Sequence, residues 1–269
     1  MKRRNFMKLA GALSVVSATG MASTLKKTES STESSGISES SATKEIYEWR
    51  IYTLKSDGTQ LDSFFESTLI PAYKRKNVKV GAFKLFKPKD GEKEQRHVLF
   101  IYPNITTYLT VKKTIWDDKE FMKKAQPFYD ATAPNPVYSN IESYLSEAFD
   151  IIPVHRNTDP SRTLLEIRIY QSPNEEANQR KVAMFNKGEI DIFDKVGVNS
   201  VFYGDIMSGP RMPALLYLTW YKDEKTRSEA WSKFGEHPDW KHMAKLPEYA
   251  NTATNNTSTL LSPMPYSQI

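Results

Sequence analysis

The chain has 269 residues, of which 39% are hydrophobic and 26% are charged, and it contains no cysteine. This length and composition are typical of a globular protein with one large domain or two domains of about 100 residues. The lack of cysteine excludes disulfides, thiolate nucleophiles, zinc–thiolate sites and iron–sulfur clusters. It also excludes a lipoprotein, which needs a cysteine at its processed N-terminus.

The formal net charge of +5 at first suggests a nucleic-acid binder. Four of the 37 basic residues stand among residues 1–22, which hold no acid, so 33 basic residues remain against 32 acidic ones, a net charge of +1. A nearly neutral chain has no basic stripe to bind phosphates, and we expect no nucleic-acid partner.

Residues 1–22 have the pattern of a secretion signal. A basic start that includes Arg3 and Arg4 precedes a mild apolar run that ends in small residues. The pair resembles the twin-arginine signature, with Lys2 where Ser or Thr is usual and Met7 where Leu is usual. We therefore predict twin-arginine export to the periplasm or the cell exterior, with a general secretory signal as the alternative. The run is too short and too polar for a transmembrane anchor, so we expect no stable membrane anchor after cleavage.

Residues 23–43 are rich in Ser, Thr and Glu and contain no aromatic residue. Such a segment buries too little apolar surface to offset the entropy of ordering it. We predict a disordered tether here, with folded structure beginning near Lys44.

The rest of the chain contains an internal repeat. Residues 47–52 (YEWRIY) recur as residues 165–170 (LEIRIY). Three further matches follow in the same order: 79–81 with 195–197, 98–102 with 214–218, and 118–121 with 238–240. Four matches in one order indicate a duplication, with a first domain at 44–150, a linker at 151–162 and a second domain at 163–269.

Each repeat is predicted to run strand, helix, strand, strand, helix, strand, from its periodicity and turn residues. This order is that of the split βαβ, or ferredoxin-like, unit, so the predicted fold class is α+β. The strands are expected near 47–54, 80–87, 96–102 and 139–147, and near 165–170, 197–205, 213–221 and 254–261. The second helices are expected at 105–125 and 223–245.

Apolar and polar residues alternate in the first strand of each repeat. We expect the apolar set to face the helices and the polar set to face the other sheet, because two such sheets can pack face to face as a pseudo-dimeric α/β barrel within one chain. A partly polar barrel interior would then bind a small organic ligand. The polar set is Glu48, Arg50 and Tyr52 in the first repeat and Glu166, Arg168 and Tyr170 in the second. The alternative is that these neighbouring Glu–Arg pairs serve packing alone.

Residues 47–54 (YEWRIYTL) resemble the Y-E-x-R-x-Y-x-L start of NIPSNAP domains, and residues 237–240 (HPDW) resemble their D-P-x-W element. The resemblance extends over most of residues 45–265 in two copies, and it implies the dimeric α/β-barrel fold. It assigns no catalytic residues. The first copy departs from the pattern, with DKEF at 118–121, so the two halves are not expected to be equivalent.

No nucleophile elbow, phosphate-binding loop or dinucleotide fingerprint occurs in the sequence. The chain has four histidines, and His237 and His242 are not spaced as ligands on one helical face. We therefore predict no metal site and no cofactor. The catalytic residues are unknown, and the candidates for moving protons are His97, Glu48 and Tyr52.

Three functions remain open. The first is a binding protein of the cell envelope, whose Arg50 and Arg168 hold an anionic or hydroxylated ligand. The second is a cofactor-independent monooxygenase or isomerase, in which arginine stabilises developing negative charge. The third is an interaction module whose barrel is only its core. Association of two chains into a homodimer is compatible with each of them.

Overall fold

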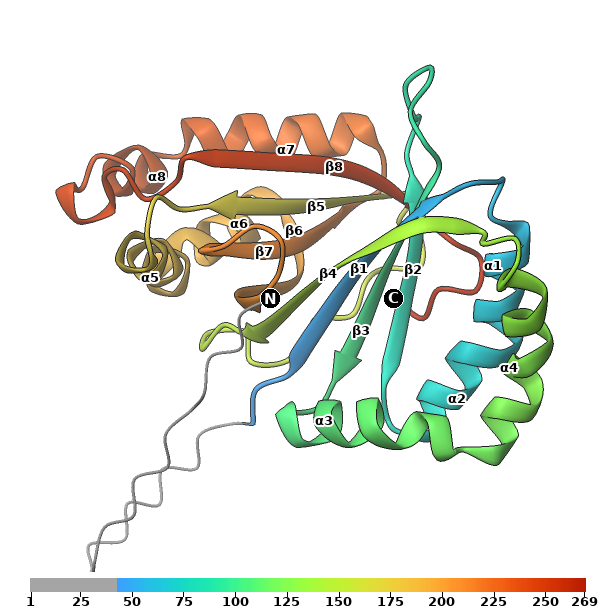
Figure 1. Cartoon of the computed structure of the whole chain (residues 1–269). Coiled ribbons are helices and arrows are strands. Elements are labelled where there is room, and N and C mark those ends of the chain that lie inside the picture. Colours follow the sequence, from blue (N-terminus) through green and yellow to red (C-terminus); the bar gives the residue numbers. More distant parts are fainter. Residues whose placement is uncertain (1–42) are drawn as a thin grey trace, which may run out of the picture. The chain divides into compact units, whose positions relative to one another are not determined.

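The structure, a computed structural model, describes residues 43–269. The predicted signal at 1–22 and all but the last residue of the predicted tether lie outside the described residues. The described part forms a closed barrel of eight antiparallel strands in the order β1-β3-β2-β8-β5-β7-β6-β4 (Figure 1). Within it, no helix is long and apolar enough to cross a membrane.

The first half supplies four strands and the helices between them. Its elements are β1 (Ile46–Leu54), α1 (Thr59–Phe64), the π-helix η1 (Phe65–Leu69), α2 (Ile70–Arg75), β2 (Lys79–Leu85), β3 (Gln95–Tyr102), α3 (Ile105–Thr114), η2 (Ile115–Asp117), α4 (Lys119–Thr132) and β4 (Tyr138–Ala148). The second half repeats this order. Its elements are β5 (Leu164–Gln171), α5 (Glu175–Met184), the π-helix η3 (Phe185–Glu189), α6 (Ile190–Val196), β6 (Asn199–Ser208), β7 (Ala214–Tyr221), α7 (Glu224–Glu236), α8 (Pro238–Met243), η4 (Pro247–Tyr249) and β8 (Asn255–Pro263).

The two sheets join along two equivalent seams, in which β2 pairs with β8 and β4 pairs with β6. Each seam joins an edge strand of one half to the edge strand of the other half, so the barrel closes without an exposed sheet edge. The predicted fold class, two ferredoxin-like units that form a pseudo-dimeric barrel, is confirmed.

The barrel interior is packed with apolar side chains from both sheets. Tyr47 and Trp49 of β1 meet Phe202 of β6, and the ring centroids of Tyr47 and Phe202 lie 4.4 Å apart. Leu165, Ile167 and Ile169 of β5 belong to the same buried cluster. The apolar set of each first strand therefore faces the other sheet.

The predicted facing of the first strands is wrong. Glu48, Arg50 and Tyr52, like Glu166, Arg168 and Tyr170, lie on the helix side of their sheets rather than inside the barrel. The physical reason is that both faces of each sheet are buried. The barrel interior takes the purely apolar set, whereas the helices bring their own polar groups to meet the other set.

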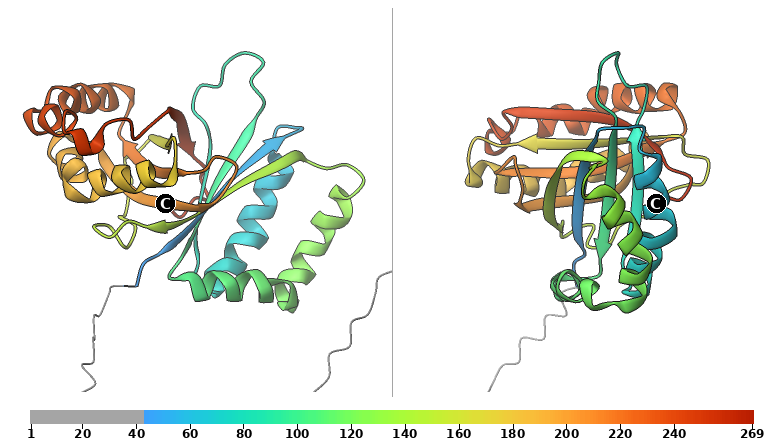
Figure 2. Two further views of the ribbon diagram at one scale, coloured as in Figure 1. Left: turned by 60° about the vertical axis from the view of Figure 1, so that its left-hand side comes forward. Right: turned by 45° about the vertical axis from the view of Figure 1, so that its right-hand side comes forward.

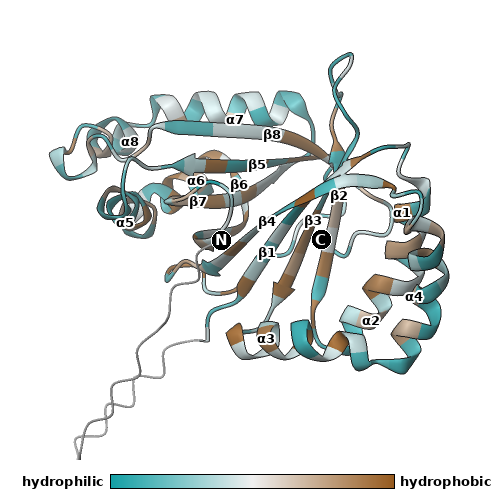
Figure 3. Cartoon of the chain, in the orientation of Figure 1, coloured by the Kyte–Doolittle hydropathy of each residue, from teal (hydrophilic) through white to brown (hydrophobic). Residues whose placement is uncertain are grey.

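Helices cover the outer face of each half of the barrel. Figure 1 shows α1 to α4 beside the strands of the first half and α5 to α8 beside those of the second half, and both views of Figure 2 agree. Each layer encloses its own buried cluster of apolar residues. Hydrophilic residues are frequent along the helices, as on α7 and α4 in Figure 3, because only one stripe of each helix meets the sheet.

Candidate ligand cavities

The helix that follows β1 widens into a π-helical turn, η1, between α1 and α2. The corresponding helix of the second half has the same feature, η3. Single π-helical turns are rare and occur frequently at functional sites. In the first half this turn brings Phe65 and Leu69 to the wall of a cavity between helices and sheet.

This cavity, which we call the first-half cavity, has a volume of about 230 Å³. Its walls are largely apolar and aromatic, and Phe64 stacks on Phe128 with ring centroids 4.1 Å apart. Trp116 and Ile141 also line it, and Trp116 is 58% exposed to solvent. The remaining lining residues are Arg50, Tyr52, Leu61, Phe65, Leu69, Tyr73, Lys112, Ile115, Phe121, Tyr129 and Tyr138.

Arg50 is a partly buried cation at the first-half cavity. Its guanidinium contacts Oε1 of Glu48 through Nε at 2.8 Å and through Nη2 at 2.7 Å, and Nη1 donates to the Tyr52 hydroxyl at 3.3 Å. It also lies 4.4 Å above the ring of Phe100. The carboxylate of Glu48 also accepts from the Tyr102 hydroxyl at 2.9 Å and lies 3.5 Å from the Lys112 ammonium. Arginine has five N–H groups, and these contacts use three of them.

The ionisable groups at this floor have fixed charges near neutral pH. Burial opposes the ionisation of Glu48, but the charges of Arg50 and Lys112 outweigh it and lower the pKa of that carboxyl. Burial raises the pKa of Tyr52 and of Tyr73, and it raises the pKa of Tyr129 to about 12. The carboxylate is therefore charged, and the tyrosines are neutral.

The second half has a cavity of about 290 Å³ between its helices and sheet, but its chemistry differs. A buried ion pair joins Lys181 of α5 and Glu189 of η3 at 2.8 Å. The Lys181 ammonium also lies over the rings of Phe185 and Trp240, at 4.7 and 5.7 Å. Burial raises the pKa of Glu189, and the charge of Lys181 opposes that shift.

Glu166 of the second half is completely buried and fully bonded. Arg227 of α7 binds it through two nitrogens at 2.7 Å each, and Arg168 binds it at 2.7 Å. The Trp231 indole and Ser258 donate to it as well. Burial opposes ionisation here too, but the bonds from Arg227 and the charge of Arg168 outweigh it and lower the pKa of Glu166 to about 2.

The predicted site residues thus fall into three separate places. Arg50 and Tyr52 line the first-half cavity, with Glu48 beneath them, and Tyr170 lines the second-half cavity. Arg168 and Glu166 are not among the residues that line the second-half cavity.

His97 faces the barrel interior, on the opposite side of the sheet from Glu48 and Tyr52. His97 therefore does not share a site with Glu48 and Tyr52, the two other candidates for moving protons. Burial also lowers the pKa of His97 to about 3, so its imidazole is a poor base.

Sequence reasoning missed the residues that the helices contribute. Lys112 and Trp116 come from α3 and η2, and Lys181 and Glu189 come from α5 and η3. A signal existed for the ion pair, because Lys181 and Glu189 are charged residues within the buried stripe of the helix that follows β5, which is mostly apolar. Lys112 carried no comparable signal, since a lysine on a surface helix is ordinary.

The comparisons with known proteins agree with this architecture. Residues 165–268 match the NIPSNAP family. The NIPSNAP match covers the second repeat, and the first repeat has the same strand and helix order. No curated protein matches the chain in sequence.

Among solved structures, a protein from Fusobacterium nucleatum that is provisionally named a monooxygenase is similar, with 13% identity and a TM-score of 0.52, covering 82% of this chain and 93% of its own. A NIPSNAP-like domain protein from Burkholderia xenovorans covers 40% of this chain and 90% of its own, with 20% identity and a TM-score of 0.36. A NIPSNAP family protein from Agrobacterium tumefaciens covers 40% and 98%, with 19% identity and a TM-score of 0.36. The similarity to the Fusobacterium protein extends over both halves and shows a shared fold.

Proposed function

We propose that the protein binds a small amphipathic organic anion in its first-half cavity. The observation that carries the proposal is the position of Arg50, a cation at the floor of a cavity whose walls, apart from Lys112, are largely apolar and aromatic. A few placed polar groups in an apolar concavity are typical of small-molecule sites. The unused N–H groups of the guanidinium suit a carboxylate, sulfonate or phosphate group.

The charge at the floor supports an anion rather than a cation. Glu48 supplies one negative charge, and Arg50 and Lys112 supply two positive ones. The excess of one positive charge is matched by a monoanionic head group. The body of the ligand would then lie between Phe64, Phe121 and Trp116.

The same geometry favours a binding protein over an enzyme. A general acid or base works best with a pKa near the working pH. Among the described lining residues, the pKa values of Tyr52, Tyr73 and Tyr129 are raised, and the pKa of Glu48 beneath them is lowered. The provisional monooxygenase name belongs to the Fusobacterium protein, and we propose no oxygenation here. From the pattern of residues 1–22 we also propose that this binding takes place outside the cytoplasm.

The test is a titration of the full-length protein, labelled with 15N at its five tryptophan indoles, with 2-naphthoate. We expect a saturable shift of the Trp116 indole signal and none of the Trp231 signal. Naphthalene, without the anion, and 2-naphthylmethylammonium, with the opposite charge, are the matched controls and should bind at least tenfold more weakly. A Trp116 signal that ignores 2-naphthoate, or that responds equally to the cation, would contradict the proposal and favour the interaction module.

A further inference from the structure

A third cavity, of about 310 Å³, lies between the two sheets at one end of the barrel interior. It lies on the opposite face of the first sheet from the first-half cavity, and both halves of the chain contribute to it. Apolar and aromatic residues form one part of its wall: Trp49, Ile51, Tyr144, Ile167 and Ile169. His97 of β3 completes this part of the lining. Three hydroxyl-bearing residues of β8, Thr257, Ser258 and Thr259, form another part.

Two polar atoms at this cavity have no hydrogen-bond partner within the described residues. They are Nε1 of Trp49 and Nδ1 of His97. Trp49 is 0% exposed and His97 is 2% exposed, and the centroids of their rings lie 5.7 Å apart. A buried polar atom without a partner costs about 1–3 kcal/mol, so two of them at one cavity require an explanation.

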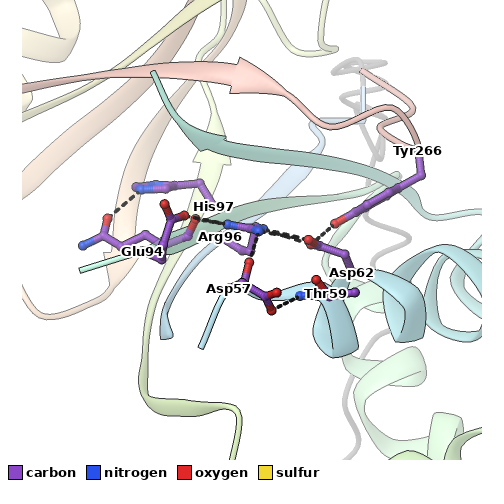
Figure 4. Close-up of polar contacts among 8 residues, drawn as sticks. Asp57, Thr59, Asp62, Glu94, Arg96, His97 and Tyr266 are labelled. Atoms are coloured by element: carbon purple, nitrogen blue, oxygen red, sulfur yellow. Dashed lines mark hydrogen bonds and ion pairs between the residues drawn. The ribbon is translucent and has the colours of Figure 1, made fainter. Parts of the chain in front are cut away.

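The two atoms offer complementary chemistry. Nε2 of His97 lies 2.9 Å from the amide oxygen of Gln95 and donates to it, which leaves Nδ1 as an acceptor (Figure 4). The indole N–H of Trp49 can only donate. Burial lowers the pKa of His97 to about 3, which keeps the ring neutral and this arrangement fixed.

The neighbouring residue on β3, Arg96, faces the helix side and has its polar groups satisfied. Arg96 points away from His97 and binds Asp62 of α1 through two nitrogens at 2.9 Å, and the Tyr266 hydroxyl donates to the same carboxylate (Figure 4). On the helix side of β3, then, the polar groups of Arg96 and Asp62 are satisfied. The unpartnered atoms of Trp49 and His97 lie on the barrel side of β1 and β3, where the cavity lies.

We propose that the barrel cavity binds a small uncharged hydroxylated organic molecule, whose oxygen accepts from Trp49 and whose O–H donates to Nδ1 of His97. An uncharged ligand fits because the charged residues of the lining, Glu142 and Arg211, carry opposite signs. The carbon skeleton of the ligand would contact Ile51, Ile167 and Tyr144. This site is independent of the proposed anion site, from which it differs in wall, location and ligand charge.

The test uses the indole-labelled full-length protein and two ligands that differ only at the oxygen. 2-Naphthol can accept from Trp49 and donate to His97, whereas 2-methoxynaphthalene can only accept. We expect 2-naphthol to shift the Trp49 indole signal saturably and to bind about five- to tenfold more tightly than 2-methoxynaphthalene, the effect of one buried hydrogen bond. In His97→Phe, which keeps a ring of similar size, the two ligands should bind equally.

Three outcomes would overturn the inference. The first is that neither ligand shifts the Trp49 signal. The second is that both ligands bind the wild-type protein with equal affinity. The third is that 2-naphthol shifts only the Trp116 signal of the first-half cavity. An ordered water that bridges both groups and resists displacement gives the first outcome. The comparison of two ligands on the wild-type protein decides the matter even if His97→Phe does not fold. A result limited to 2-naphthoate leaves the anion site standing and this site overturned.

Discussion

The two halves of the barrel share one fold and place an Arg two residues after a Glu on the helix side of the sheet, yet they use this pair differently. In the first half, Arg50 lies at the floor of a largely apolar cavity, and some of its N–H groups can still donate to a ligand. In the second half, Arg168 lies 4.5 Å above Trp231 and binds a Glu166 that Arg227 already holds. The same sequence motif therefore forms a candidate site in one copy and a closed ion-pair network in the other.

The difference lies in the helices. When the two copies are aligned on their π-helical turns, η1 and η3, Leu61 corresponds to Lys181 and Leu69 corresponds to Glu189. Two leucines in the first half leave an apolar wall, whereas the second half spans the same place with a buried ion pair. Strand motifs are thus a poor guide to function in a duplicated fold. The helices that cover the sheet decide whether a polar group present in both copies can still bind a ligand.

The largest expected effect tests the ion pair of the second half. Lys181→Met leaves Glu189 buried without its partner, and we expect a loss of about 3–5 kcal/mol in the free energy of unfolding, measured by urea denaturation. The double variant Lys181→Leu/Glu189→Leu, which copies the first half, should recover most of that loss.

The control for this series is Lys187→Met, an exposed lysine of η3, which should change the free energy of unfolding by less than about 0.5 kcal/mol. A loss below about 1 kcal/mol in Lys181→Met would show that the pair does not hold the second half together.

The second prediction compares how the stabilising effects of Glu166 and Glu48 depend on pH. The pKa of Glu166 is lowered to about 2 in the folded chain, against an ordinary value of 4.5, so its stabilising effect is present above pH 4.5 and is lost as the pH falls towards 2. We expect Glu166→Gln to lose about 3 kcal/mol at pH 7 and to approach the wild-type stability as the pH falls through this window.

Glu48→Gln should show the same trend with a smaller amplitude, because Glu48 has one partly buried arginine partner and a half-exposed Lys112. Urea denaturation at pH 7, 5, 4 and 3 measures both series. A stability difference between Glu166→Gln and wild type that is the same at pH 7 and pH 3 would refute the role of this carboxylate.

A smaller difference in stability is expected between variants of two tryptophans in the helix layers, Trp231 of the second half and Trp116 of the first half. Trp231 donates to Glu166 at 2.9 Å, so Trp231→Phe should cost about 1.5–3 kcal/mol, the value of a bond to a charged group. Trp116 is largely exposed at the mouth of the first-half cavity, and Trp116→Phe should change stability by less than about 0.5 kcal/mol. Thermal unfolding of both variants measures the difference, and equal losses would remove the distinction between a cavity mouth and a structural network.

The sequence predicted the architecture well because duplication and strand alternation are local signals. All eight strands and the barrel closed by one chain followed from residues 47–52, their recurrence at 165–170 and the turn residues between strands. The sequence did not predict which face of each strand points to the barrel interior. Alternation separates the two faces of a strand, but it does not show which face the helices cover and which face the other sheet covers.

The site was predicted only in part, for the same reason. Arg50 and Tyr52 line a cavity on the helix side of the sheet instead of the predicted barrel interior, and His97 belongs to another cavity. The contributions of Lys112 and of the pair Lys181–Glu189 depend on helix packing across long sequence separations. Such contacts have no period in the sequence, so periodicity did not reveal them.

The most direct test of the functional difference between the halves compares Arg50→Met with Arg168→Met for binding of 2-naphthoate to the full-length protein. Methionine keeps much of the length of arginine and removes its charge. We expect Arg50→Met to weaken binding at least tenfold, because a charge-assisted hydrogen bond is worth about 1.5–3 kcal/mol, and Arg168→Met to leave the dissociation constant within about twofold while it lowers the melting temperature. Equal weakening in both variants, or a larger effect of Arg168→Met, would contradict the assignment of binding to the first half.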